Sequence, residues 1–344
     1  MTDSELSKFI ISASTEALSA AQEVQDETDP AAEMELRSVS VPVESHGSRL
    51  DKALAGLVPE FSRSYLQQLI EAGGVLVKGL QTLKTSAKVK AGDDLTIELR
   101  PTPQSQAFKP ESMALDIVYQ DEHLWVINKP AGLVVHPAPG NWSGTLLNGL
   151  LAHDPRAFFM PRAGIVHRLD KDTSGLMVVA RQRQTMDQLV GMIAARTVSR
   201  EYIALAHGTW DGAKTRQVDA PIGRDPRNRL RMAVVDLEKN AGKTASTVVS
   251  LLDSSGKHSL VKCKLHTGRT HQIRVHMAFL GHPLVSDLLY GGNFSGELER
   301  QALHACRLAF SHPATGELME FKSTPPPDLL EAIKNCGLSY NPGV

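Results

Sequence analysis

Apolar side chains recur at helical spacing twice near the start of the chain. Leu50, Leu54 and Leu57 form the first stripe, and Ser48 stands where the N-cap of that helix would lie. The second stripe covers residues 62–72 and ends at a pair of glycines, which commonly terminate helices. Short apolar runs predict strands over residues 41–45, 75–79 and 94–99.

A longer succession of short apolar runs follows in the second half of the chain. Predicted strands outnumber helices there and do not alternate strictly with them. This order favours an α+β domain with a mixed, largely antiparallel sheet over a doubly wound fold. The predicted strands span residues 115–119, 124–128, 164–169, 175–180, 202–206, 244–252, 259–266, 303–310 and 317–321, and the predicted helices span residues 185–196, 270–280 and 328–335.

Changes in composition divide the chain into domains. Residues 1–45 contain few large apolar side chains, and we expect an acidic tail that is mostly disordered. A small domain is expected over residues 46–100, and three prolines within residues 101–113 predict a linker. The larger domain then covers residues 114–337, before a short tail over residues 338–344.

The formal net charge of −1 hides an asymmetry along the 344 residues. Residues 1–45 hold ten acidic and two basic residues, a net charge of −8. The remainder holds 35 basic and 28 acidic residues, a net charge of +7. The whole-chain charge argues against a nucleic-acid partner, whereas the basic body that follows the acidic tail is compatible with one.

Hydrophobic residues make up 42% of the chain and charged residues 22%, which excludes disorder of the whole chain. No apolar run reaches the ~18 residues of a membrane span, and the first residues lack the pattern of a secretory signal. Cys263, Cys306 and Cys336 are widely spaced and odd in number, which is typical of reduced thiols. These features predict a cytoplasmic protein with no membrane partner.

Two polar clusters interrupt the apolar runs of the larger domain. Residues 167–175 place His, Arg, Asp, Lys, Thr and Ser between two predicted strands. This arrangement suits reactive side chains on a rigid frame, and it suits a solvated turn equally well. Residues 265–276 contain a potential helix cap, and the first turn of that helix would offer free N–H groups to a phosphate. A surface helix with three histidines is the alternative for this second cluster.

The sequence lacks the motifs that are typical of metal sites and of nucleotide-binding sites. His266, His271 and His276 are five residues apart, so a helix would not stack them on one face, and the cysteines form no closely spaced pair. The chain contains no G-x-x-x-x-G-K-[ST] loop, no dinucleotide fingerprint and no Gly-x-Ser-x-Gly elbow. We therefore expect no metal and no cofactor.

The first polar cluster, His167-Arg-Leu-Asp170-Lys-Asp-Thr-Ser-Gly175, resembles the catalytic motif of the RluA/RluD family of RNA pseudouridine synthases. Other segments resemble further motifs of the family in the same order, and the resemblance is nearest to the RluD branch. One departure is Ser286, where the family usually has Gly. The segments that carry the resemblance are residues 128–137, 200–208, 267–277, 281–291, 301–305 and 321–326.

Residues 48–100 resemble the small αL-type RNA-binding domain that also occurs in a small-subunit ribosomal protein. This resemblance implies that Arg49, Arg63 and Lys78 contact RNA from a helical face. The alternative is a basic face that is simply solvated.

The resemblance of the larger domain implies a pseudouridine synthase fold and isomerisation of uridine in RNA. Asp170 matches the catalytic carboxylate, which acts as nucleophile or base, and Arg274 matches the arginine that pairs with it. Tyr202 matches the tyrosine that stacks on the target base. Arg168 matches the residue that enters the RNA stack when the uridine flips out. Further RNA contacts are expected from His167, Arg269, His271, Lys129, Arg227 and Arg229. For Lys129 the alternative is support of the fold, and an ordinary exposed loop would explain Arg227 and Arg229 equally well.

The RluD branch implies large-subunit ribosomal RNA as the partner of a monomeric enzyme, with targets in the hairpin that faces the decoding site. The same chemistry on tRNA is the nearest alternative. A non-catalytic RNA-binding assembly factor is another, against which the intact Asp170, Tyr202 and Arg274 argue. A metal hydrolase built on the histidines is the third.

Overall fold

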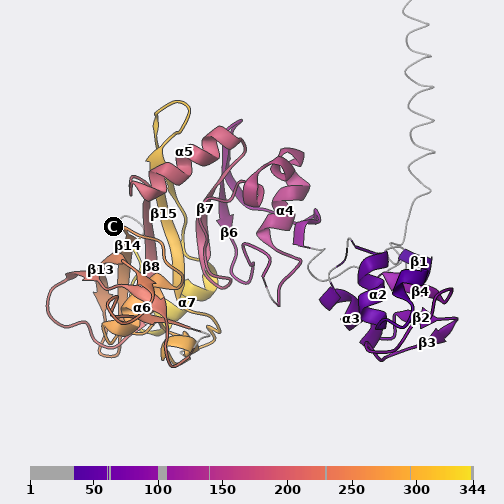
Figure 1. The fold of residues 1–344 in the computed structure, drawn as a ribbon. Helices are drawn as coiled ribbons and strands as arrows, with labels where there is room; N and C mark the ends of the chain where they lie inside the picture. Colours follow the sequence, from indigo (N-terminus) through magenta and orange to yellow (C-terminus); the bar gives the residue numbers. More distant parts are fainter. Residues whose placement is uncertain are drawn as a thin grey trace, which may run out of the picture. The chain divides into compact units, whose positions relative to one another are not determined.

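The computed structural model describes residues 35–59, 61, 63–99, 107–138, 140–228, 231–294 and 296–341. The chain divides into two compact units, Met1–Gln104 and Ser105–Val344 (Figure 1). Of the predicted acidic tail, residues 1–34 lie outside the described part of the chain.

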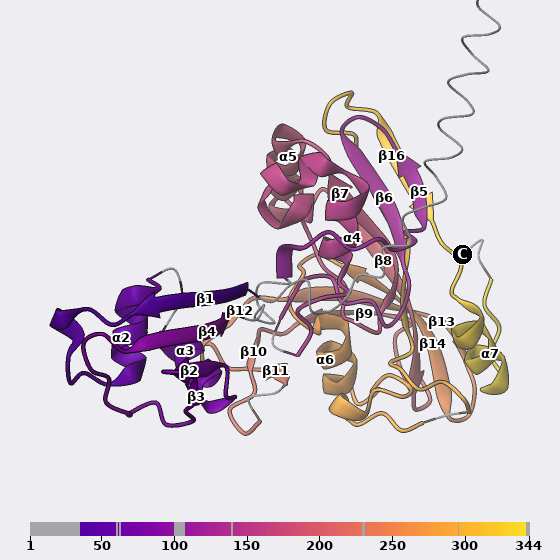
Figure 2. The same cartoon turned by 90° about the vertical axis from the view of Figure 1, so that its right-hand side faces the viewer.

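A four-stranded antiparallel sheet and two helices form the first unit (Figure 2). The helices bury their apolar stripes, including Leu54 and Leu66, against Val75 and Ile97 of the sheet. This burial stabilises helices that are too short to persist alone. The elements are β1 (Glu35–Ser40), α2 (Leu50–Leu57), α3 (Arg63–Glu71), β2 (Val75–Val77), β3 (Leu80–Gln81) and β4 (Asp94–Leu99), with the strand order β1-β4-β2-β3.

The start of this unit differs from the prediction. Strand β1 pairs with β4 along its whole length, so the disordered tail expected over residues 1–45 is wrong for residues 35–40. This strand lies at the edge of the sheet and has one partner, and its polar sequence gives no strand signal. The strand expected over residues 41–45 is instead the 3₁₀ helix Val43–Ser45, preceded by Pro42, which has no N–H for a ladder.

A nine-stranded sheet forms the centre of the second unit. Its pairs are antiparallel except where β7 runs parallel to β15, so the predicted mixed, largely antiparallel sheet is confirmed. Strand β16 pairs with the far half of β15. In sheet order the strands are β5 (Ile117–Gln120), β6 (Leu124–Lys129), β7 (Ser174–Ala180), β15 (Leu303–Ser311), β8 (Ser199–His207), β14 (His258–Leu265), β13 (Ser246–Ser254) and β9 (Thr215–Asp219), with β16 at Leu318–Lys322.

Helices cover both faces of this sheet. Trp125 and Ile127 of β6 belong to one apolar cluster with α4 and α6, whereas Leu124 and Val126 belong to another cluster with α5. Helix α7 packs on β8 residues that point away from α6. The alternation of strand side chains therefore produces two cores, one on each face. The helices are α4 (Leu146–His153), α5 (Arg183–Ala194), α6 (Gln272–Phe279) and α7 (Pro327–Asn335); a small sheet comprises β10 (Ile222–Arg224), β11 (Met232–Val234) and β12 (Gly242–Lys243).

One further prediction about secondary structure is wrong, and one helix is absent from the predictions. Residues 164–169 do not form a strand; Ile165 makes an isolated bridge to Val179, and the rest is irregular. Helix α4 was not expected, because its residues are apolar on nearly every side and show no amphipathic stripe.

Parts of the predicted linker and of the predicted C-terminal tail pack on the second unit. Ala107 is buried, and Asn148 Nδ2 donates to the carbonyl of Lys109 at 2.8 Å. At the other end, Leu338 is buried in an apolar cluster, and the N–H of Ser339 donates to Asp253 Oδ2 at 2.8 Å. Residues 107–113 and 338–341 therefore belong to the unit, while residues 101–106 and 342–344 lie outside the described part.

Gly175 allows β7 to approach β15. Its φ is +115°, and a Cβ built there would lie 2.3 Å from the carbonyl oxygen of Ala305. Beside it, Ser174 Oγ and His304 Nδ1 form a buried hydrogen bond at 3.0 Å. A side chain at residue 175 would therefore force the two strands apart.

We expect Gly175→Ala to lower the unfolding free energy by about 2–4 kcal/mol, because it adds both a clash and backbone strain. Urea unfolding followed by circular dichroism measures this change. The matched control is Gly191→Ala, since Gly191 lies in α5 with open space around it. That control should be neutral or stabilising, and equal effects of the two substitutions would contradict the prediction.

Candidate active site

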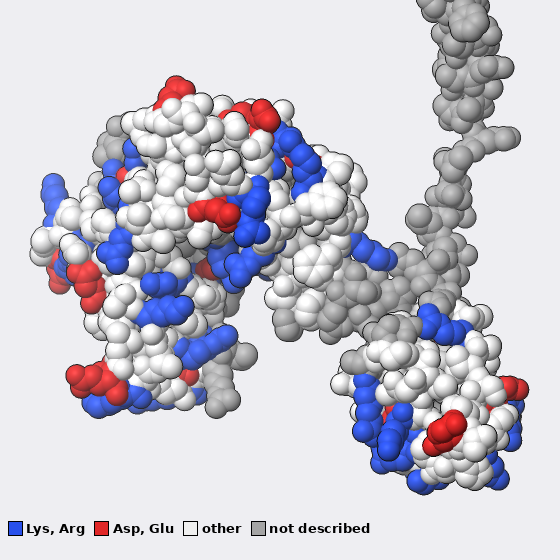
Figure 3. Space-filling model, turned by 45° about the horizontal axis from the view of Figure 1, so that its top comes forward, with Lys and Arg blue, Asp and Glu red and all other residues white. Residues whose placement is uncertain are grey.

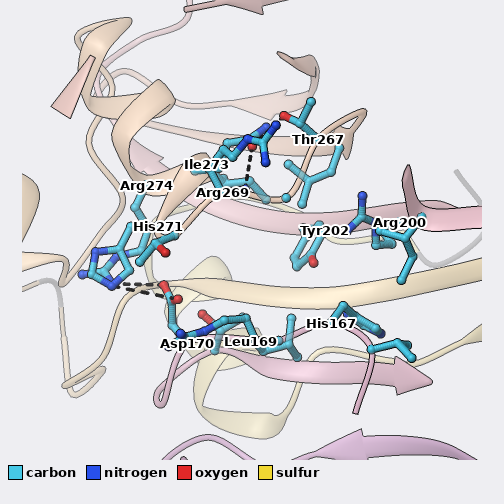
Figure 4. A pocket seen from close by; sticks show the side chains of 18 of the residues that line it. His167, Leu169, Asp170, Arg200, Tyr202, Thr267, Arg269, His271, Ile273 and Arg274 are labelled. Carbon is cyan, nitrogen blue, oxygen red and sulfur yellow. Dashed lines mark hydrogen bonds and ion pairs between the residues drawn. The ribbon is translucent and has the colours of Figure 1, made fainter. Parts of the chain in front are cut away.

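A cavity of about 410 Å³ lies in the second unit (Figure 4). Its wall comprises the segment before β7, the start of β8 and the loop that leads from β14 into α6. Asp170, Tyr202 and Arg274 all line it, although 104 residues separate the first from the last. The fold thus brings the three predicted catalytic residues together.

Asp170 stands in a turn directly before β7, and this turn is held from behind. The N–H of Thr173 donates to the carbonyl of Asp170 at 3.1 Å. Lys129 Nζ donates to the carbonyl of Lys171 at 2.9 Å, and Arg300 Nη1 donates to the carbonyl of Asp172 at 3.1 Å. Two consecutive backbone carbonyls within the turn are therefore fixed by cations from distant parts of the chain.

The predicted contact of Lys129 with RNA is wrong, because this side chain is completely buried. Its ammonium donates to the carbonyls of Pro130, Leu133 and Lys171 at 2.7 to 2.9 Å. Burial lowers the pKa of Lys129 to about 8, so the ammonium keeps its three protons at neutral pH. All three donors are used inside the fold, and the one that binds the carbonyl of Lys171 supports the Asp170 turn.

Arg274 bridges two carboxylates. Its Nε and Nη2 donate to Asp287 at 2.7 and 2.8 Å, and its Nη1 donates to Asp170 Oδ2 at 3.1 Å. Arg274 is 7% exposed and Asp287 only 2%. Burial alone would lower the pKa of Arg274, but the two carboxylates outweigh it and raise that pKa above its ordinary value. The bidentate pair fixes the guanidinium plane and presents one N–H to Asp170.

His271 and Tyr290 lie next to the ion pair of Arg274 with Asp170. The guanidinium of Arg274 lies 4.9 Å from the centroid of the Tyr290 ring, and the Tyr290 hydroxyl lies 2.8 Å from His271 Nδ1. His271 Nε2 lies 4.0 Å from Asp170 Oδ1. Burial lowers the pKa of His271, although the Asp170 carboxylate opposes this shift. The imidazole is therefore neutral at neutral pH and offers no charge to a phosphate.

Tyr202 lies in β8 on the cavity wall (Figure 4). Burial raises the pKa of Tyr202 to about 12, so its phenol stays protonated. Leu169, Leu265 and Ile273 line the same cavity and pack in the same apolar cluster. An aromatic ring among aliphatic side chains suits a flat, neutral ligand such as a nucleobase.

Two family models match the chain. The model described as RNA pseudouridylate synthase matches residues 123–279, which include Asp170, Tyr202 and Arg274. The S4 domain matches residues 48–95, in the first unit.

Relatives that are named for the large ribosomal subunit align with most of this chain. "Ribosomal large subunit pseudouridine synthase D" of Neisseria meningitidis serogroup B is 49% identical over 86% of this chain and 80% of that protein. The protein of the same name from Pseudomonas aeruginosa is 47% identical over 86% of this chain and 93% of that protein. This chain belongs to the RNA pseudouridine synthase family.

A solved structure supports the fold of this pseudouridine synthase. Human RNA Pseudouridylate Synthase Domain Containing 1 superposes with a TM-score of 0.51 at 28% identity, covering 66% of this chain and 90% of that one. Together with the S4 match, it confirms the predicted fold class of a synthase domain preceded by a small RNA-binding domain.

The other residues that were predicted to contact RNA at the cavity differ in their exposure and charge. Arg168 is exposed on its wall. Arg269 is partly buried, and its Nε donates to the carbonyl of Thr244 at 3.0 Å. His167 Nε2 accepts the N–H of Val178 at 3.0 Å, and burial lowers the pKa of His167 to about 3. His167 is therefore neutral, and of these three only the arginines carry charge.

In the S4 unit, one buried acid orients two predicted RNA-binding arginines. Asp51 is 0% exposed and lies 3.0 Å from Arg49 Nε and 2.8 Å from Arg63 Nη2, while both arginine side chains remain about half exposed. Lys78 is exposed and pairs with Asp93 at 2.8 Å. On the face shown in Figure 3, basic side chains gather on this unit. Its arginines are thus held in fixed positions on an accessible surface.

Arg227 is exposed in the loop after β10 and does not line the cavity, and Arg229 lies outside the described residues.

His266 lines the cavity, whereas His276 is buried between Thr247 and Ala220. Within the described part of the chain, no three His, Cys, Asp or Glu side chains converge as metal ligands do. The same part contains no helix that is long and apolar enough to cross a membrane.

Asp287, Tyr290 and Arg300 were assigned no role in the sequence analysis. Asp287 and Tyr290 stand in a segment that carries the family resemblance, and that was the available signal. Arg300 fixes the Asp170 turn from 128 residues away, a contact that no local pattern encodes.

We expect Lys129→Met to lower the unfolding free energy by about 2–4 kcal/mol, because three buried carbonyls lose their donor. Urea unfolding measures the change. Lys171→Met is the matched control, since Lys171 is exposed on the same turn, and it should stay within about 0.5 kcal/mol of the wild type. If Lys129→Met kept full stability and weakened RNA binding instead, the buried role of Lys129 would be refuted.

Proposed function

We propose that this chain isomerises specific uridines of large-subunit ribosomal RNA to pseudouridine, with Asp170 as the catalytic carboxylate. The observation that carries the proposal is the ion pair of Arg274 with Asp170 on the wall of the cavity. Two relatives named for the large ribosomal subunit, each aligned over 86% of the chain, support this RNA as the substrate. The S4 unit adds a second surface that suits RNA.

The reaction is an internal rearrangement that consumes no co-reactant. The N1–C1′ bond of uridine breaks, a C5–C1′ bond forms, and C5 loses a hydrogen while N1 gains one. Asp170 either attacks the sugar or removes a proton from it, and both roles require an ionised carboxylate. The Arg274 guanidinium, oriented by Asp287, favours that form. The remaining task is to hold base and sugar while they are detached.

The target uridine must leave the RNA stack to reach Asp170 inside the cavity. Arg168 is exposed there, and its planar guanidinium can stack where the base departs. Tyr202 then receives the face of the extruded base. The resemblance to the RluD branch implies targets in the hairpin that faces the decoding site, and extrusion of a base costs least in such a loop.

We propose that the enzyme acts as a monomer. We place the enzyme in the cytoplasm, where Cys263 and Cys306 would stay reduced as the free thiols that they are in the structure. The same chemistry on tRNA is the second candidate, and it needs the same residues.

We expect Asp170→Asn to lower the conversion of uridine by about 10²-fold or more, with RNA affinity retained. Ribosomal RNA from a strain that lacks this enzyme is treated with each purified variant and then with the carbodiimide that marks pseudouridine. Primer extension reads the stops, and tRNA is treated in parallel. Asp187→Asn is the control, because Asp187 lies on the exposed side of α5. Stops of wild-type intensity with Asp170→Asn would refute the assignment, and stops in tRNA alone would refute the substrate.

A further inference from the structure

Three buried nitrogens on residues that line the cavity have no hydrogen-bond partner within the described part of the chain. They are Arg200 Nε, His167 Nδ1 and His136 Nε2. A buried donor or acceptor without a partner costs about 1–3 kcal/mol, so such groups are rare in folded proteins. Their grouping around one cavity indicates that a ligand, rather than the fold, satisfies them.

Arg200 is the most costly of the three, because it carries a permanent charge. It is only 6% exposed, and its side chain makes no ion pair and no hydrogen bond with any residue that the structure describes. The other strongly buried arginine, Arg274, has two carboxylate partners. The buried Nε–H of Arg200 has no acceptor within the described part of the chain, and the side chain lines the cavity, so Arg200 is placed to meet an electron-rich group from outside the chain.

The strand places Arg200 next to the surface that receives the base. Arg200 and Tyr202 are two residues apart in β8, so their side chains point to the same face, with about 7 Å between their backbones. Figure 4 shows Tyr202 between Asp170 and Arg200. A base that lies on Tyr202 with its sugar at Asp170 therefore directs its far edge toward Arg200.

Gly268 leaves room for the Arg200 guanidinium at this end of the cavity, and His167 supplies a second hydrogen-bond donor. A Cβ built on Gly268 would lie 2.9 Å from Arg200 Nη1, so the glycine leaves the space that the guanidinium uses. His167 accepts the N–H of Val178 at Nε2, which leaves its proton on Nδ1 as an unused donor. Both unused donors suit carbonyl oxygens.

We propose that Arg200 binds a carbonyl oxygen of the target uracil, on the edge away from the ribose, and stabilises the charge of the detached base. This inference rests on the proposed function. When the N1–C1′ bond breaks with its electron pair left on the base, negative charge spreads over the uracil carbonyl oxygens. A fixed, desolvated guanidinium beside one of these oxygens stabilises that state more than the bound substrate.

The burial of Arg200 favours the base over a backbone phosphate. Phosphates lie on the outside of RNA, and three exposed arginines already line the cavity to meet them, namely Arg162, Arg168 and Arg196. Arg200 is buried, unlike these three, and lies beside Tyr202 (Figure 4). Only a group that enters the cavity reaches it.

The test compares the wild type with Arg200→Met and Arg200→Lys under single turnover. The substrate is a transcript of large-subunit ribosomal RNA with tritium at C5 of uridine, which is released when the C5–C1′ bond forms. We expect Arg200→Met to slow release by about 10²–10³-fold at saturating enzyme, with less than about a threefold change in Kd. Arg200→Lys should restore part of the rate, because it returns the charge without the planar fork.

The salt dependence of Kd separates base from phosphate. Arg196→Met, the matched control from the exposed part of the same cavity, should weaken binding and reduce the slope of log K against log salt by about 0.7–0.9. The same signature in Arg200→Met, with an unchanged rate at saturation, would overturn the uracil assignment. Thermal unfolding of Arg200→Met should match or exceed the wild type, because no ion pair is lost, and a lower midpoint would assign Arg200 to the fold instead.

The failure of the proposed function is distinguishable from the failure of this inference. If the wild type releases no tritium from the transcript, the substrate proposal is wrong. If the wild type releases tritium and Arg200→Met does so at the same rate, Arg200 has no part in stabilising the base.

Discussion

The active site depends on one buried guanidinium that lies between two carboxylates. Asp287 holds Arg274 through two hydrogen bonds, and the remaining arm of Arg274 reaches Asp170. The cost of burying this charge is offset because both carboxylates accept from it. Asp287 is buried, whereas Asp170 borders the cavity. The carboxylate that we propose as catalytic is thus positioned from within the core.

The surrounding fold keeps the reactive end in place. Lys129 and Arg300 fix the carbonyls of the Asp170 turn, and Gly175 lets the strand after the turn pack tightly on β15. These contacts join segments that are far apart in the sequence, and they leave little freedom to Asp170. The opposite wall of the cavity is different, because Arg200 lacks a partner within the described chain. We infer that the site is preorganised at the carboxylate and completed by the substrate at the far edge of the base.

The sequence was most informative where a signal was local. The stripes of Leu54 and Leu66 predicted the helices of the S4 unit, and a contiguous motif pointed to Asp170. It was least informative about burial and about partners distant in the chain. Lys129 was expected to support either the fold or RNA binding, and nothing in its sequence neighbours shows that three carbonyls converge on it. The pairing of Arg274 in α6 with Asp287 in the loop that follows this helix, and the unpartnered Nε of Arg200, are likewise not encoded by a local pattern.

The central claim is that Asp287 acts on the reaction only through Arg274. A double-mutant cycle in single-turnover rate tests it, with Arg274→Met, Asp287→Asn and the combined variant. Each folded variant is assayed on the same ribosomal RNA transcript. If the claim holds, Asp287→Asn slows the reaction alone but adds nothing to the loss caused by Arg274→Met. If the two losses multiply in the combined variant, Asp287 contributes independently, and the proposed chain of charges does not govern the site.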